Sequence, residues 1–392
     1  MLAIVGVLLQ PQSSAAKIDR TLRVLTNFPG GSGRVLLIDQ AKRRIRITPK
    51  KQPRGGWASW WYVQVTGLQV GETIQLEVGK SPWATPRQAS VSDDGSKWRR
   101  SAPGKPADQF MTYSIRASAA KMFFAWGPPF QQSRATQLLK RAAGAISRAK
   151  VVTICRTRER RSVQALSIQA EDHRYGVWVQ ARQHAWEVGS SWVCEGLIEW
   201  LVSRDPRARE FRKHASVMVV PIVDADSVAD GLGGKEQRPR DHNRDWSENP
   251  HWPYVAAAMA QLKHWNKQRR LDLFIDLHNP AATSTAPFFL VPPRKRLATD
   301  GRRRLDLFLA ACRLDLAGPL KFRGQSFESG PNYDHRWKTI AKNWVALHCR
   351  SKVVSVTLET PWNTSQGTSK GYRLVGRGLA IASHRYLFKM KP

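Results

Sequence analysis

From Ser133 to the end of the chain, short apolar runs alternate with amphipathic runs, and this alternation constrains the fold more than any other feature. The apolar runs have the length and β-branched content of buried strands, at residues 175–181, 216–223, 271–277 and 353–358. The other runs have helical spacing, at residues 135–149, 191–202, 254–269, 304–316 and 376–388. Alternating strands and helices typically form a sheet covered by helices. We therefore expect residues 131–392 to form an α/β domain with a mixed, mostly parallel sheet flanked by helices.

The segment before this domain has a different pattern. Short alternating or apolar runs follow one another without helical spacing between them, at residues 35–38, 44–48, 60–65 and 73–78. Turn signals separate them, among them Gly67, Gly71 and the sequence Asp93-Asp94-Gly95. Many short strands at such spacing are typical of two packed sheets. The sequence therefore predicts an all-β sandwich domain over residues 17–130.

The first 16 residues resemble a signal peptide. Residues 2–9 are apolar, and the small residues 13–16 that follow suit a cleavage site, although no basic residue precedes the apolar run. With such a signal the protein is secreted or periplasmic. If residues 1–16 are instead an apolar tail or a first strand, the protein is cytoplasmic.

The chain carries 63 basic and 30 acidic residues, a formal net charge of +33. Such a field attracts anions, including nucleic acids, anionic surfaces and acidic peptides, but it also serves solubility in general. The densest basic runs, residues 42–54, 156–161 and 294–304, accompany no recognition helix or finger spacing, so nucleic acid is not the expected partner. No apolar run approaches the roughly 18 residues of a membrane span. No feature indicates an oligomeric state.

Metal-type ligands follow two of the predicted strands. His184 and Glu187 lie just after residues 175–181, and His278 ends the strand that begins at residue 271. An imidazole and a carboxylate three residues apart in a turn can bind one ion, although this spacing alone also arises by chance. Two histidines and one glutamate leave a fourth position open for water, which is the pattern of a catalytic zinc site. Four cysteines without a CxxC pair do not favour a cysteine zinc site.

Several longer motifs make a family resemblance specific. The segment ARQHAWEVGSSWV, residues 181–193, resembles the metal segment of cytosolic carboxypeptidases. Those enzymes belong to the wider carboxypeptidase A-type zinc family. The N-terminal pieces WWYVQV (60–65), VSDDGSKW (91–98) and FAWGPPF (124–130) are similar to the sandwich that precedes catalysis in the cytosolic type.

The resemblance implies a zinc peptidase that cleaves at a peptide or protein C-terminus. One zinc ion is expected on His184, Glu187 and His278, and Glu359, at the end of a late strand, is expected to be the general base. The Asn243-Arg244 pair is expected to bind the substrate's terminal carboxylate, because a guanidinium pairs bidentately with a carboxylate.

Further roles follow from the same resemblance. Asp241 is expected to accept the second ring N–H of His184. The family arginine that stabilises the oxyanion is missing, and Lys235 and Arg238 are the two candidates for its place. Tyr333 is a candidate for a hydrogen bond to the substrate, although a packed loop tyrosine is the simpler interpretation.

The expected substrate is a peptide with a C-terminal amino acid to be removed, and the cytosolic type as a class removes terminal or branched glutamates. Two alternatives remain open. One is a zinc amidohydrolase of the aspartoacylase kind, which shares the metal ligands and the Asn-Arg pair but does not usually begin with a sandwich. The other is a catalytically silent protein that binds peptide tails or anionic polymers.

Overall fold

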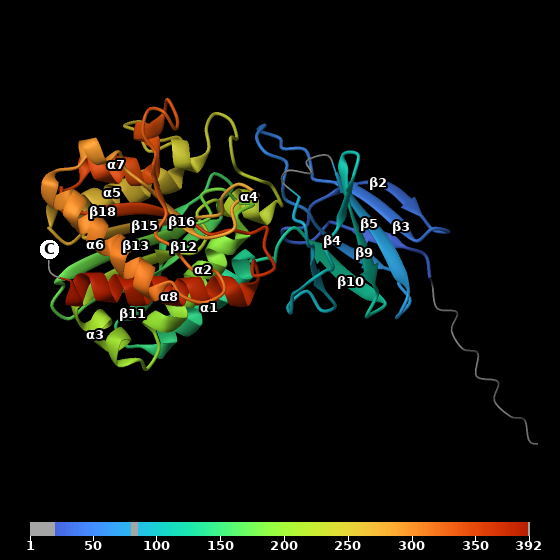
Figure 1. Ribbon diagram of the computed structural model, residues 1–392, viewed down its shortest axis with the longest axis horizontal. Coiled ribbons are helices and arrows are strands. Elements are labelled where there is room, and N and C mark those ends of the chain that lie inside the picture. Colours follow the sequence, from blue (N-terminus) through green and yellow to red (C-terminus); the bar gives the residue numbers. More distant parts are fainter. Residues whose placement is uncertain (1–19, 80–84, 391–392) are drawn as a thin grey trace, which may run out of the picture.

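The computed structural model describes residues 20–79 and 85–390 (Figure 1). An all-β part and an α/β part lie side by side, with the N-terminal strands in the first and the helices in the second. The predicted signal peptide lies outside the described residues. The predicted fold class is confirmed in both parts, and the last sandwich strand ends at Ala125, shortly before the first helix begins at Gln132.

The all-β part consists of two five-stranded sheets. One sheet has the order β1 (Arg23–Leu25), β4 (Tyr62–Thr66), β10 (Lys121–Ala125), β6 (Ser90–Ser92) and β7 (Arg99–Arg100). The other has the order β2 (Arg34–Asp39), β3 (Arg44–Thr48), β5 (Thr73–Gly79), β9 (Phe110–Arg116) and β8 (Lys105–Ala107). All pairs are antiparallel except β3 with β5.

The period-two pattern of these strands explains the core between the sheets. In β3, Ile45 and Ile47 are fully buried while the residues beside them are only partly covered. Trp61, next to β4, packs against Tyr113 of β9, with ring centroids 6.2 Å apart. Large apolar side chains from both sheets thus share one interior, as a sandwich requires.

The α/β part is built on an eight-stranded sheet. Its order is β11 (Ala149–Arg156), β12 (Ser162–Ile168), β14 (Ala215–Val220), β13 (Tyr175–Ala181), β15 (Leu273–His278), β18 (Val354–Glu359), β16 (Phe288–Val291) and β17 (Ser326–Glu328). The four adjacent strands β14, β13, β15 and β18 are parallel, and nearly all of their residues are buried. Helices on both faces account for this burial.

Helices lie on both sides of this sheet (Figure 1). The α-helices are α1 (Gln132–Ala145), α2 (Val188–Leu201), α3 (Pro206–His214), α4 (Ala225–Ala229), α5 (Pro253–Lys267), α6 (Thr299–Asp315), α7 (Ala341–His348) and α8 (Ser369–Lys389). The described residues also form the short 3₁₀ helices η2 (His242–Arg244), η3 (Arg294–Arg296) and η4 (Trp337–Thr339). Helix α8 packs along α2 and α6, while α5 and α7 lie on the opposite side of the sheet.

The structure corrects several predicted boundaries. The helix expected over residues 135–149 is α1, which ends at Ala145 because Ile146 has an extended backbone and Ala149 already begins β11. Helices α6 and α8 begin five and seven residues before their predicted starts, at Thr299 and Ser369. The sequence prediction missed the hairpin of β11 and β12, whose polar residues hide the alternation, and it missed β16, β17 and α7.

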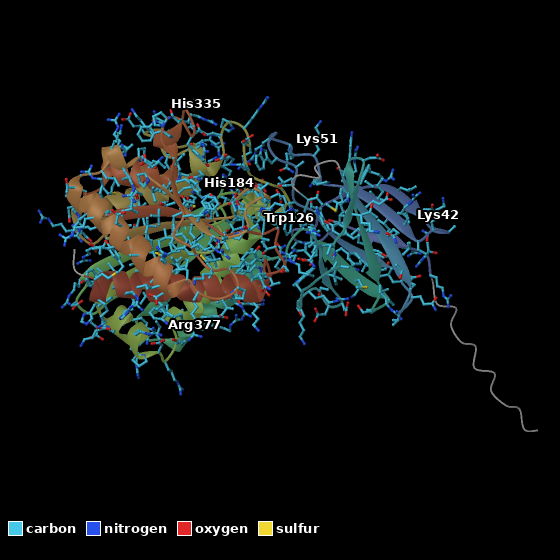
Figure 2. The ribbon with its side chains drawn as sticks, viewed as in Figure 1. Lys42, Lys51, Trp126, His184, His335 and Arg377 are labelled. Carbon is cyan, nitrogen blue, oxygen red and sulfur yellow. The ribbon has the colours of Figure 1, made fainter. Side chains whose placement is uncertain are left out.

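The two parts of the chain share a polar and aromatic interface. Arg100 of the sandwich donates to the backbone carbonyls of Trp362 and Gly367 in the α/β part, and to that of Gln88. Trp126 lies at this boundary (Figure 2), with its ring 4.4 Å from that of Trp362. The sandwich is thus attached to loops of the α/β part.

Two further features of the described residues concern membrane-spanning helices and the cysteines. No helix among them combines the length and apolarity that a bilayer crossing needs. All four cysteines of the chain have free thiols.

Candidate active site

Three neighbouring strands bring the candidate residues to one edge of the sheet. Strands β13, β15 and β18 run parallel, so their carboxyl ends lie together. His278 is the last residue of β15 and Glu359 is the last residue of β18, and the two are direct register partners. The turn after β13 carries His184 and Glu187 to the same edge, and α2 begins at the next residue.

His184, Glu187 and His278 form a compact cluster, each at most 3% exposed. One ligand atom from each of the three lies within 4.8 Å of the others. The Nδ1 atom of His184 is 2.7 Å from Glu187 Oε1, and Nδ1 of His278 is 2.7 Å from Glu187 Oε2. His184 lies inside the α/β part on the side that faces the sandwich (Figure 2).

The charges of the histidines and carboxylates in this cluster strongly affect one another. Burial alone would raise the pKa of the Glu187 carboxyl, but the two adjacent histidines hold that pKa below its ordinary value. Burial opposes a charge on His278, yet Asp276 and Glu187 raise its pKa well above the ordinary value. The site therefore favours an anionic Glu187 that is neutralised by positive charge.

A carboxylate lies beside the second nitrogen of each histidine. His184 Nε2 is 3.4 Å from Asp241 Oδ1, and neither atom has a hydrogen-bond partner in the described part of the chain. His278 Nε2 is 3.0 Å from Asp276 Oδ2. Carboxylates in this position orient metal-binding imidazoles and set their tautomer.

Asp241 lies beside the ring nitrogen of His184 from which it is expected to accept a hydrogen bond, and that bond stays a prediction. The sequence prediction missed Asp276. A signal existed, because Asp276 and His278 are two residues apart in one strand and so project from the same face.

These residues fit a zinc ion. Two imidazoles and one carboxylate are a donor set that zinc binds readily, and three protein ligands leave one coordination position open. All three side chains are buried and converge, and Asp241 and Asp276 supply the outer carboxylates that zinc-binding histidines usually have. Divalent charge would also compensate the buried carboxylate of Glu187.

Glu359 has the environment of a proton acceptor. Its side chain is 8% exposed, and its Oε2 atom has no hydrogen-bond partner among the described residues. Burial raises the pKa of its carboxyl to about 7, and Glu187 adds to this while His278 opposes it. A carboxyl with a pKa near neutrality can accept and return a proton at the working pH.

The Asn243-Arg244 pair lies in η2, and both residues line the cavity that contains the strand ends. Asn243 is fixed by the backbone N–H of Ala341, which donates to its Oδ1 at 3.0 Å, and its Nδ2 is 3.4 Å from His278 Nε2. Arg244 donates through Nε to Asp334 at 2.6 Å and through Nη1 to a backbone carbonyl. Two nitrogens of the guanidinium are thereby held, which orients the remaining donors.

The two candidates for the missing arginine occupy different positions. Lys235 lines the cavity together with the metal cluster, and its positive charge lowers the pKa values of Glu359 and Asp241 alongside larger effects. Arg238 is exposed and does not line the cavity. The geometry therefore favours Lys235.

A cavity of about 730 Å³ joins these residues. Tyr333 lines it and is 51% exposed, a position from which it can reach a ligand. Trp57 of the sandwich also lines this cavity, so both parts of the chain form its wall. The sequence offered no signal for this role of Trp57 among sixteen tryptophans.

Lys342, at the start of α7, is a further residue that the sequence did not reveal. It lines the same cavity, is fully buried, and donates from Nζ to the Ser329 hydroxyl. Among the described residues no carboxylate lies within salt-bridge distance of it. Burial lowers the pKa of its ammonium to about 7, although Asp276 acts in the opposite direction. A buried ammonium without an anion is costly, which suits a site that receives one.

Comparison with known families agrees with this geometry. A family model described as "Zinc carboxypeptidase" matches residues 136–372, more than half of the chain, and one described as "Cytosolic carboxypeptidase N-terminal domain" matches residues 24–126. An uncharacterized protein of Zymomonas mobilis is 27% identical over 354 residues, which cover 87% of this chain and 88% of that protein. Cytosolic carboxypeptidase 6 of Caenorhabditis elegans is 30% identical over 134 residues, 32% of this chain and only 29% of the worm protein.

Solved structures show the same fold. A metallo-carboxypeptidase from Burkholderia cenocepacia has a TM-score of 0.81 and 21% identity, with 94% of this chain and 99% of that chain covered. The metallo-carboxypeptidase from Pseudomonas aeruginosa in complex with (2-guanidinoethylmercapto)succinic acid has a TM-score of 0.79 and 21% identity, with coverage of 93% and 99%. With the family match over its α/β part, this chain belongs to the zinc carboxypeptidase family: it is a metallocarboxypeptidase whose cofactor is zinc.

Proposed function

We propose that this enzyme removes a C-terminal acidic amino acid from peptides, with His184, Glu187 and His278 as the zinc ligands. The observation that carries the proposal is the meeting of these three side chains with Glu359 at adjoining strand ends, in one cavity with Arg244 and Lys342. When bound, zinc supplies a Lewis acid that acidifies water and polarises a carbonyl.

The protein's own residues transfer the proton, bind the substrate and stabilise the developing charge. Glu359 takes a proton from the attacking water at its carboxylate and passes it to the nitrogen of the leaving amine. Arg244 and Asn243 bind the terminal carboxylate and so place the last peptide bond beside Glu359. The ammonium of Lys235 stabilises the negative charge that develops on the carbonyl oxygen of the cleaved peptide bond. Asp241 orients His184, and Tyr333 donates a hydrogen bond to the substrate.

An acidic terminal side chain is supported by Lys342. Its ammonium is buried in the cavity, near Arg244 and Glu359 as their electrostatic effects on it show, but without a carboxylate partner of its own among the described residues. The carboxylate of a terminal glutamate or aspartate would supply the missing anion and offset the cost of burial. A glutamine or leucine side chain in the same place would leave the charge unpaired.

The proposal is tested by measuring bound zinc and then the amino acids released from peptides that end in Glu, Gln, Lys or Leu, with and without chelator. Chelator-sensitive release of a single terminal glutamate is the expected result. Release from N-acyl amino acids but not from peptides would instead support the amidohydrolase alternative. Bound zinc with tight peptide binding and no release would support the silent binding protein.

Replacing Lys342 by methionine is expected to change selectivity. The value of kcat/KM for a Glu-terminated peptide should fall roughly 10²- to 10³-fold, because the buried ion pair with the substrate is lost. The value for a Leu-terminated peptide should rise. The thermal midpoint should stay level or increase, since an unpaired buried charge is replaced by an apolar chain of similar length. Lys338→Met, an exposed lysine four residues earlier, is the control and should leave selectivity unchanged.

Selectivity is also expected to depend on pH. Lys342 is charged below its pKa of about 7, so kcat/KM for Glu-terminated peptides should decline relative to Gln-terminated ones as the pH rises through that value. The ratio cancels the titration of Glu359, which affects both substrates alike. A Glu-to-Gln ratio that stays constant through neutrality would argue against a role for Lys342.

A further inference from the structure

A loop of the sandwich is paired with the loop that carries Lys235. We call residues 52–57 the sandwich loop and residues 233–238 the cation loop. The N–H of Trp57 donates to the carbonyl of Lys235 at 3.0 Å, and the N–H of Arg238 donates to the carbonyl of Arg54 at 2.7 Å. The side chain of Gln52 accepts from the N–H of Gly233 at 2.8 Å. Three hydrogen bonds thus connect the two loops along their length.

Glycines permit this close approach. Gly56 has a φ of +88°, and a Cβ there would lie 2.2 Å from the carbonyl oxygen of Lys235. A Cβ on Gly233 would lie 2.1 Å from the carbonyl oxygen of Trp57. Side chains at either position would push the loops apart. The contact is therefore built into both segments of the chain.

The ring of Trp57 connects the cation to the metal segment. Lys235 Nζ lies 5.1 Å from the centroid of that ring, which is within cation–π range. The same ring lies 6.2 Å from that of Trp186, at an interplanar angle of 33°. Trp186 stands between His184 and Glu187 in sequence, and its N–H donates to the carbonyl of Gly233 at 3.0 Å. Trp57 thus contacts the cation and the metal segment at once.

A lysine in this place needs such support. Its four-carbon chain has many rotamers and ends in a point charge, whereas a guanidinium is planar and pre-organised. Lys235 is only partly buried and forms no salt bridge among the described residues, so the ring of Trp57 is the contact that restricts its ammonium.

We infer that Trp57 is a positioning residue for Lys235, so that the sandwich domain is a working part of the active site. The inference rests on the role proposed above for Lys235. The ring holds the ammonium toward the scissile carbonyl, and its contact with Trp186 keeps the distance between the ammonium and the metal ligands constant. Trp57 should therefore stabilise the transition state, in which negative charge develops on the substrate oxygen, and should contribute little to the initial binding of the substrate.

The test compares Trp57→Leu, Trp57→Phe, Lys235→Met and the double variant Trp57→Leu/Lys235→Met in the zinc-loaded enzyme. Trp57→Leu should lower kcat on the order of tenfold with KM nearly unchanged, because a cation–π contact of this kind is lost. Trp57→Phe should recover much of kcat. The double variant should be no slower than Lys235→Met, because Trp57 acts through that lysine.

A binding measurement supplies a second readout. A peptide phosphinate carries a tetrahedral anionic group that mimics the oxyanion. By calorimetry, Trp57→Leu should lower the affinity for this inhibitor by a similar factor and should leave the affinity for free glutamate unchanged. Bound zinc should equal that of wild type. Trp98→Leu is the control: Trp98 packs against Tyr62, 5.6 Å away, and does not line the cavity, so only stability should change.

Wild-type kcat and phosphinate affinity in Trp57→Leu would overturn the inference. So would a double variant whose losses multiply, since that would give Trp57 an effect independent of Lys235. A zinc-loaded wild-type enzyme that releases no terminal residue would overturn the proposed function instead. In that case the difference in phosphinate affinity between wild type and Trp57→Leu would still test the contact.

Discussion

Glu359→Gln is expected to bind zinc as the wild-type enzyme does and to lose kcat by roughly 10²- to 10⁴-fold, the usual contribution of a general base. Glutamine keeps the size and the position of the side chain at the end of β18 but cannot accept the proton of the attacking water. The substrate is bound by other groups, so KM should change little. Zinc content by mass spectrometry and kcat for a Glu-terminated peptide measure the two effects separately.

The environment of Glu359 suits this residue to act as the general base better than other carboxylates of the protein. It is buried beside the ligand cluster, its Oε2 atom has no protein partner among the described residues, and its pKa is raised to about 7. Glu328 also ends a strand, but it is exposed and does not line the cavity. Glu328→Gln is therefore the matched control and should be fully active. A Glu359→Gln enzyme with wild-type kcat would refute the mechanism proposed above.

His278→Ala is expected to remove zinc and activity together. The change deletes one of three converging donors and removes one of the two imidazoles that compensate the charge of the buried Glu187 carboxylate. Zinc per protein after dialysis should fall from about one toward zero, and peptide release should fall below detection. The thermal midpoint should no longer rise when zinc is added, because a ligand stabilises only the state that binds it.

His335→Ala controls for the removal of an imidazole. The side chain of His335 is 85% exposed and stands away from His184 on the surface (Figure 2). It should therefore keep zinc and activity. A His278→Ala enzyme that retained stoichiometric zinc would show that the metal lies elsewhere, and the cluster would lose its assigned role.

Local patterns in the sequence determined the scaffold of the site. The apolar runs ending near His184, His278 and Glu359 predicted parallel strands, and parallel strands necessarily bring their carboxyl ends to one edge. The metal roles of these residues came from the resemblance to carboxypeptidases, but their meeting at one edge of the sheet could be predicted from the sequence alone, because it depends only on the period of each strand and on residues close to its end. The same holds for the all-β sandwich, which follows from alternation and turn residues.

Only the tertiary structure revealed the groups that reach the site from elsewhere. Lys342 is a single lysine in a short helix, and no pattern distinguishes it from a surface cation until folding buries it beside the cavity. Lys235 lines the cavity and Arg238 does not, and this difference depends on the conformation of the cation loop. Trp57 precedes Lys235 by more than 170 residues and meets it only because two glycine-containing loops pair across the interface. Local periodicity is written in adjacent residues, whereas these contacts arise from long-range packing, which a single sequence does not display.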